Sequence, residues 1–170
     1  MKKLTTLVLV ACLPLLGMAQ SKAVIDFQNK YSSHENVTYV TIKGSLFNLL
    51  ATVAEYDDDD DPDEDLQAFA RIANGISSMQ VLKVPYYETK LNREEVASLR
   101  NTLAKEDYEE FIMIKEGREL INVMAQGAKN EVRNILVLIE DKEDFTLISI
   151  NGKLSMKDLS YFSRNHAKFH

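Results

Sequence analysis

The stretch VRNILVLIE, residues 132–140, decides the fold class of this chain. Its β-branched and aliphatic residues are typical of a β-strand, and similar runs follow one another through the C-terminal half. These runs occupy residues 108–115, 119–126, 132–140 and 145–151. The polar breaks between them are too short for crossover connections, so neighbouring strands must be antiparallel. The C-terminal half therefore predicts an antiparallel β-meander, with Asn151-Gly152 as its end.

Two of these runs, Phe111–Ile114 and Ile135–Ile139, are continuously apolar. A strand with one face in water should instead alternate between apolar and polar residues, so both faces of the central strands are expected to be at least partly covered. Helices can cover one face while loops or further helices cover the other. Alternatively, one face meets a partner, a second copy of the chain or an apolar ligand.

The N-terminal half alternates between helical and strand patterns. Apolar spacing predicts helices at 24–31 and 46–54, with Ser21 and Ser45 as their caps, and the run at 37–42 predicts a strand. Later segments predict a helix ending at Asn74-Gly75, a strand at 79–84, a helix capped by Asn92 and a last helix capped by Ser155. The chain thus predicts a single α+β domain, residues 20–170, in which the meander packs against several helices.

Residues 1–19 have the pattern of a cleavable secretory signal peptide. Lys2 and Lys3 precede an apolar segment at 4–16, and small residues stand at 17 and 19 before Gln20. We expect an exported protein that begins near Gln20, with the periplasm as its destination and secretion or outer-membrane association as alternatives. Leu9–Cys12 resembles a lipobox, but the apolar segment at 13–16 that would follow it argues against lipidation of Cys12.

Composition narrows the classes of function. Removal of Lys2 and Lys3 from the 20 basic residues leaves 18 against 26 acidic residues, a net side-chain charge of −8. Such a chain lacks the clustered Lys and Arg that phosphate backbones require, so we expect no nucleic-acid partner. Cys12 is the only cysteine, so disulfides and cysteine-based metal sites are excluded from the mature chain. No apolar stretch after residue 20 approaches the length of a membrane span.

The acidic segment at 57–65 is the most conspicuous candidate site. Clustered carboxylates suit Ca²⁺, and Asp57, Asp59, Asp61 and Asp63 are the candidate ligands for weak calcium binding. The spacing is not that of an EF-hand, because Pro62 occupies the position where that loop needs glycine. The other interpretation is a solvated loop whose acids favour the start of the following helix.

No catalytic constellation stands out. His166 and His170 have the spacing of a helical metal pair but lack a third ligand, and His34 lies in a polar turn. Ser45 follows Gly44 without the second glycine of a nucleophile elbow. An enzyme would need a site assembled from scattered polar residues, such as two close carboxylates or a carboxylate beside His34. The sequence indicates no cofactor.

The organisation of the chain resembles that of a family of exported bacterial proteins known as domain of unknown function 4252. The resemblance rests on the first amphipathic helix at 24–31, the strand–Gly–Ser–helix unit at 37–54, the acidic start of the next helix, and a meander ending in Asn151-Gly152-Lys153-Leu154. It implies no activity, cofactor or catalytic residue. Its association with genes for alternative sigma factors implies a role in envelope stress or regulation. We therefore expect a non-catalytic envelope protein that binds a protein partner, a ligand or a second copy through the sheet, with an enzyme or a calcium-binding protein as alternatives.

Overall fold

The computed structural model describes residues 20–55, 64–128 and 130–166. It contains these elements in chain order: α1 (Lys22–Tyr31), β1 (Thr38–Lys43), α2 (Gly44–Glu55), α3 (Glu64–Gly75), β2 (Ile76–Pro85), α4 (Tyr86–Thr89), α5 (Arg93–Lys105), β3 (Glu109–Glu116), β4 (Glu119–Ala128), β5 (Glu131–Glu140), β6 (Asp144–Ser155) and α6 (Met156–His166). The predicted α+β class is confirmed, and α4 is a short helix that the sequence patterns did not indicate.

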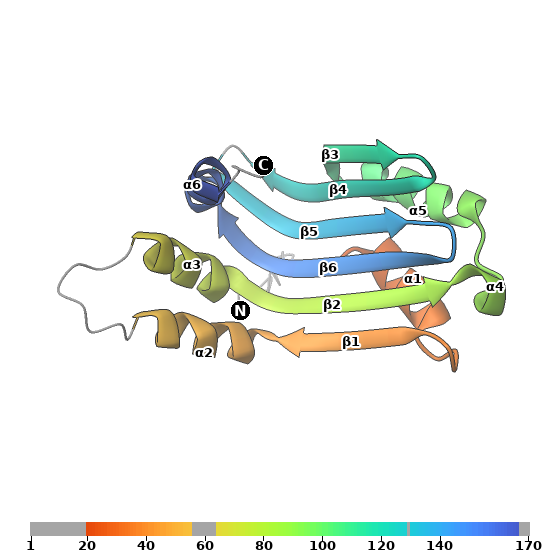
Figure 1. The fold of residues 1–170 in the computed structure, drawn as a ribbon, viewed down its shortest axis with the longest axis horizontal. Helices are drawn as coiled ribbons and strands as arrows, with labels where there is room; N and C mark the ends of the chain where they lie inside the picture. Colours follow the sequence, from red (N-terminus) through yellow and green to blue (C-terminus); the bar gives the residue numbers. More distant parts are fainter. Residues whose placement is uncertain (1–19, 56–63, 129, 167–170) are drawn as a thin grey trace, which may run out of the picture.

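All strands belong to one six-stranded antiparallel sheet with the order β1-β2-β6-β5-β4-β3 (Figure 1). The predicted meander of β3 to β6 is confirmed. β2 pairs with β6 along its length, and this pairing joins the N-terminal half to the meander. β1 and β3 are the two edges of the sheet.

The prediction that Asn151-Gly152 ends the meander is wrong, because β6 continues to Ser155. Gly152 pairs with Ile76, and a Cβ atom on Gly152 would lie 2.2 Å from the carbonyl oxygen of Gly75. Glycine therefore allows two backbones to approach closely at this position, a role that glycine often has inside strands.

Three of the predicted helix caps are confirmed. The Ser21 side chain accepts a hydrogen bond from the Val24 backbone N–H (3.2 Å), and Asn92 accepts one from that of Glu95 (2.8 Å). Ser155 Oγ accepts hydrogen bonds from the backbone at the start of α6. The prediction for Ser45 is wrong, because β1 leads directly into α2, which already begins at Gly44.

The main core fills one face of the sheet. Leu82, Leu136 and Leu147 point from the strands towards α1 and α5 and are fully buried. Phe27 of α1 packs edge-on against Phe145 of β6, with ring centroids 5.5 Å apart. A smaller core of alanines lies between α2 and α3. We call the face that carries the main core the covered face.

The opposite face of the sheet carries no helix over its middle. Figure 1 shows α1 and α5 behind the sheet, whereas α2, α3 and α6 gather at one end of it and α4 lies at the other end. Within the described residues, helices therefore do not cover both faces of the sheet, whereas cover of the second face by loops and contact with a partner stay alternatives.

Candidate functional site

The uncovered side of the sheet, which we call the open face, is lined by apolar side chains. Alternation along each strand separates them from the core: Leu136 and Leu138 of β5 are buried on the covered face, whereas Val137 between them points to the open face. The strand registers place the following residues on the open face: Val40, Ile42, Met79, Val81, Ile112, Ile114, Ile121, Val123, Ile135, Val137, Ile139, Ile148 and Ile150.

One row of this face crosses every strand of the sheet. It contains Val40, Val81, Ile148, Val137, Val123 and Ile112. All six are β-branched. The row is most accessible at its two ends, where Val40 is 44% and Ile112 is 50% exposed. A continuous apolar surface of this kind is characteristic of interaction sites, since scattered exposed apolar residues are normal but contiguous patches are not.

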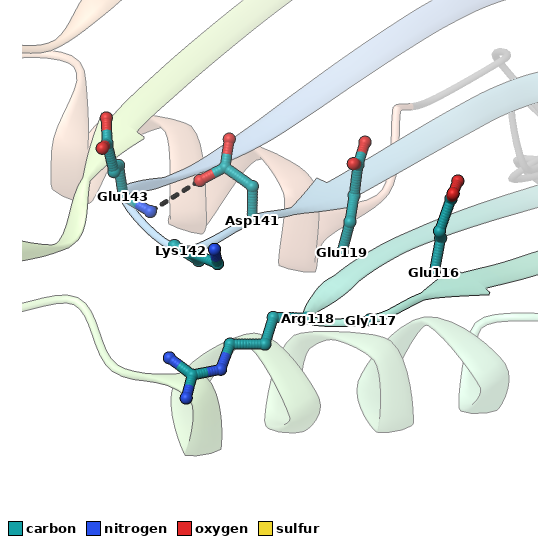
Figure 2. A pocket seen from close by; sticks show the side chains of 7 residues that line it. All are labelled: Glu116, Gly117, Arg118, Glu119, Asp141, Lys142 and Glu143. Atoms are coloured by element: carbon teal, nitrogen blue, oxygen red, sulfur yellow. Dashed lines mark hydrogen bonds between the residues drawn. The ribbon is translucent and has the colours of Figure 1, made fainter.

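Acidic side chains border the open face where the β3–β4 and β5–β6 loops meet. Glu116 and Glu119 share the face of Ile114 and Ile121, because Glu116 lies two residues after Ile114 in β3 and Glu119 lies two residues before Ile121 in β4. Asp141 and Glu143 come from the β5–β6 loop, and Figure 2 shows all four carboxylates pointing to the same side. We call these four residues the acidic border.

The loop that carries half of this border is held by Asp141. Its Oδ1 accepts hydrogen bonds from the backbone N–H groups of Glu143 (2.6 Å) and Asp144 (2.8 Å). Partial burial acts to raise the pKa of Asp141, but these two hydrogen bonds and the Lys83 ammonium group outweigh it and leave the pKa below its usual value. The Asp141 carboxylate therefore stays ionised at neutral pH.

A second feature lies on the covered side of the same loops. A cleft of about 550 Å³ is bounded by α5 and the β3–β4 hairpin, and its lining includes Arg93, Arg100, Lys115, Arg118 and Glu140. We call it the basic cleft. In Figure 2, the Arg118 side chain points towards α5, away from the four carboxylates of the acidic border. At this end of the sheet, acids therefore outnumber cations on the open side, whereas cations outnumber acids in the basic cleft.

Glu140 organises the basic cleft. Its side chain is 5% exposed, and its carboxylate lies 3.1 Å from the Arg100 guanidinium and 4.0 Å from that of Arg93. Arg93 also donates a hydrogen bond to the carbonyl oxygen of Asp141 (2.7 Å) and lies over the Tyr86 ring. Burial and the nearby Glu140 carboxylate raise the pKa of Tyr86 to about 12, and its hydroxyl has no hydrogen-bond partner among the described residues.

The candidate residues from the sequence are not brought together by the structure. Asp57, Asp59, Asp61 and Asp63 lie outside the described residues, as does His170. His34 is exposed near the ring of Tyr31, and Ser45 lies in the first turn of α2. The last described residue, His166, ends α6.

Within the described part of the chain, no cluster of three or more His, Cys, Asp or Glu side chains is suited to holding a metal ion. The same ranges contain no helix long and apolar enough to cross a membrane.

Sequence reasoning missed Glu140. Counting in steps of two from Leu136 through Leu138 would have placed it on the buried face. A carboxylate at such a position requires a cationic partner, but which arginine reaches it depends on how α5 lies on the sheet.

These features define a single-domain α+β protein with helices over one face of an antiparallel sheet and an apolar, acid-bordered surface on the other. The chain belongs to the family described as domain of unknown function (DUF4252), whose model matches residues 31–162. No significant match was found among curated proteins or among solved structures.

Proposed function

We propose that this protein is a non-catalytic, exported protein of the bacterial envelope that works by binding another protein through its open face. The observation that carries the proposal is the unbroken apolar row from Val40 to Ile112. The setting in the envelope rests on the signal-peptide pattern of residues 1–19. A regulatory role in envelope stress accords with the family resemblance.

The size of the open face suits a modest protein interface. Strands about 4.8 Å apart and same-face residues about 6.8 Å apart give each residue about 33 Å², so the thirteen apolar residues of the open face have a footprint of roughly 420 Å². That is below the size of standard specific interfaces, which bury about 600–1,000 Å² on each partner. An interface of this size fits a partner that binds reversibly.

Charge indicates the chemistry of the partner. The middle of the open face is apolar, whereas Glu116, Glu119, Asp141 and Glu143 stand along one margin. The complementary surface is an apolar patch bordered by Lys or Arg. Two copies of this chain, each with a net charge of −6 over the full sequence, would repel one another, so we favour a different protein over a second copy.

The proposal can be tested by photo-crosslinking in intact cells. A photoreactive residue is introduced at Val137 on the open face and, as a control, at Asn101, which is exposed on α5. We expect one discrete product from Val137 and none from Asn101. Mass spectrometry then identifies the partner, and the crosslinked site should lie in an apolar patch with basic neighbours.

A charge reversal makes the test specific. Glu119→Lys should reduce the crosslinked product, because it places a cation opposite the basic rim of the partner. Lys153→Glu is the matched control, because Lys153 is exposed on β6 and is no part of the acidic border. A product that contains only a second copy of the chain would replace the proposed partner with a homodimer. The absence of any product from Val137, Ile148 and Val123 in folded protein would overturn the proposal.

A calcium-binding role through the segment at 57–65 stays a separate hypothesis, which calorimetry with CaCl₂ would test. An enzymatic role also stays a separate hypothesis, because Glu116, Glu119, Asp141 and Glu143 line a pocket of about 510 Å³, which has room for a small substrate.

A further inference from the structure

The basic cleft lies on the covered side of the sheet and is independent of the open face. Three elements form it: α5 supplies Arg93 and Arg100, β5 supplies Glu140, and the β3–β4 hairpin supplies Lys115 and Arg118. Lys115 pairs with Leu120, which in turn pairs with Glu140, so alternation puts all three in one row on the covered face.

The hairpin turn fixes where Arg118 lies. Glu116 pairs with Glu119, so only Gly117 and Arg118 make the turn. Gly117 has a φ of 58°, a conformation that favours glycine in two-residue hairpin turns. This tight turn holds Arg118 close to Lys115 and directs it towards α5, as Figure 2 shows.

The cleft has more positive than negative charge. Among the described residues, its lining includes four cations but two carboxylates, those of Glu119 and Glu140. The single charge of Glu140 is shared between Arg93 and Arg100. Among the described residues, Lys115 and Arg118 form no ion pair with a carboxylate. Four converging cations are unusual in an acidic chain, since surface cations there can readily find carboxylate partners.

The arginines of the cleft are held in place before any ligand arrives. Glu140 fixes the Arg100 guanidinium, and the Asp141 carbonyl oxygen and the Tyr86 ring fix that of Arg93. A preorganised guanidinium loses less conformational entropy on binding than a free side chain does.

We propose that the basic cleft binds a small oxyanion ligand, one that carries a phosphate or carboxylate group, through Arg118 and Lys115 with Arg100 behind them. Guanidinium groups pair with either anion through two parallel hydrogen bonds, and an ammonium group adds a point charge. The volume of about 550 Å³ accommodates a metabolite-sized ligand rather than a macromolecule.

The experiment is a titration of ¹⁵N-labelled protein, residues 20–170, with sodium phosphate and separately with sodium succinate. Sodium chloride holds the ionic strength constant throughout. We expect saturable shifts of the amide signals of residues 115–120, Arg93 and Arg100 with at least one anion. The anion that binds more tightly distinguishes a phosphate site from a carboxylate site.

Variants make the result decisive. Removal of two charge-assisted partners by Lys115→Ala with Arg118→Ala should weaken binding by about tenfold or more. Glu140→Gln should instead tighten binding several-fold, because removing a negative charge that repels the anion outweighs the loss of fixed arginine positions. A purely structural role of the cations does not predict this gain. Lys142→Ala is the matched control, because Lys142 belongs to the same end of the sheet but lines the acidic side.

The proposal would be overturned if sodium chloride alone caused the same amide shifts as phosphate or succinate. It would also be overturned if the shifts were spread evenly over residues near all surface lysines. Unchanged affinity in the Lys115/Arg118 double variant would overturn it as well. Both residues are exposed, so that double variant is expected to fold even if Glu140→Gln does not. Failure here leaves the open-face proposal intact, because Val137 lies on the other side of the sheet.

Discussion

Leu136 and Val137 are adjacent in β5 but point to opposite faces of the sheet, so their substitution tests directly whether the open face is uncovered. Leu136 is 0% exposed in the main core, and Leu136→Ala should cost about 2–5 kcal/mol through lost burial and the cavity left behind. Val137→Lys places a charge on the open face, where it stays in water. Its cost should be below about 1 kcal/mol, the range of β-propensity differences.

The assay is urea denaturation of residues 20–170, followed by circular dichroism, with thermal unfolding as a second measure. For a domain of this length, Leu136→Ala should lower Tm by roughly 4–20 °C and Val137→Lys by no more than about 4 °C, since each kcal/mol corresponds to about 2–4 °C. Val137→Thr is the conservative control. If Val137→Lys destabilises the protein as much as Leu136→Ala does, the open face is covered within the monomer, and the proposed binding surface is refuted.

The remaining predictions concern single positions. Gly152→Ala should destabilise the protein by about 1–3 kcal/mol in urea, because its Cβ would meet the carbonyl oxygen of Gly75; an unchanged midpoint would contradict this close approach. Asn92→Ala should cost about 1 kcal/mol through loss of the α5 cap, whereas Asn92→Ser should retain most of the stability. Tyr86→Phe should change stability by less than about 0.5 kcal/mol, because the buried hydroxyl makes no hydrogen bond to a described group; a large loss would reveal a hidden partner. The pKa of Asp141 is lowered from 3.8, so its stabilising contribution is present above pH 3.8 and is lost as the pH falls through the folded-state value. Asp141→Asn should flatten that acid limb of the unfolding curve, and an unchanged slope would contradict the assignment.

Local chemistry explains what the sequence predicted well. The caps at Ser21, Asn92 and Ser155 involve a side chain and a backbone N–H only two or three residues away, so spacing alone identifies them. The four meander strands were predicted for a similar reason, since short breaks leave their neighbours no choice but antiparallel pairing. Ser45 was misjudged because a cap was assumed between β1 and α2, whereas the strand leads directly into the helix at Gly44.

Long-range contacts explain what the sequence did not predict. The insertion of β2 beside β6, with paired residues 59 to 76 positions apart, depends on the close approach of Gly75 and Gly152, which no local pattern reveals. The unalternating runs Phe111–Ile114 and Ile135–Ile139 fitted either a face covered by helices or a face that meets a partner. The placement of α1 and α5 on the same side of the sheet argues against helices over both faces, and a partner on the open face stays a prediction.

The β3–β4 turn carries both proposed surfaces, which allows a test of whether they act separately. Arg118 points to the basic cleft, while Glu116 and Glu119, its neighbours along the hairpin, belong to the acidic border. If the surfaces are independent, Glu116→Lys should reduce crosslinking from Val137 without changing the amide shifts caused by phosphate or succinate at Arg93 and Arg100, because Glu116 is not part of the cleft lining. The Lys115/Arg118 double variant should weaken the amide shifts caused by the anions without reducing crosslinking from Val137. If instead each variant changes both measurements, the hairpin links anion binding on the covered side to partner binding on the open face. The physical reason would be that acidic and basic side chains so close together on the hairpin interact electrostatically with the same ligand.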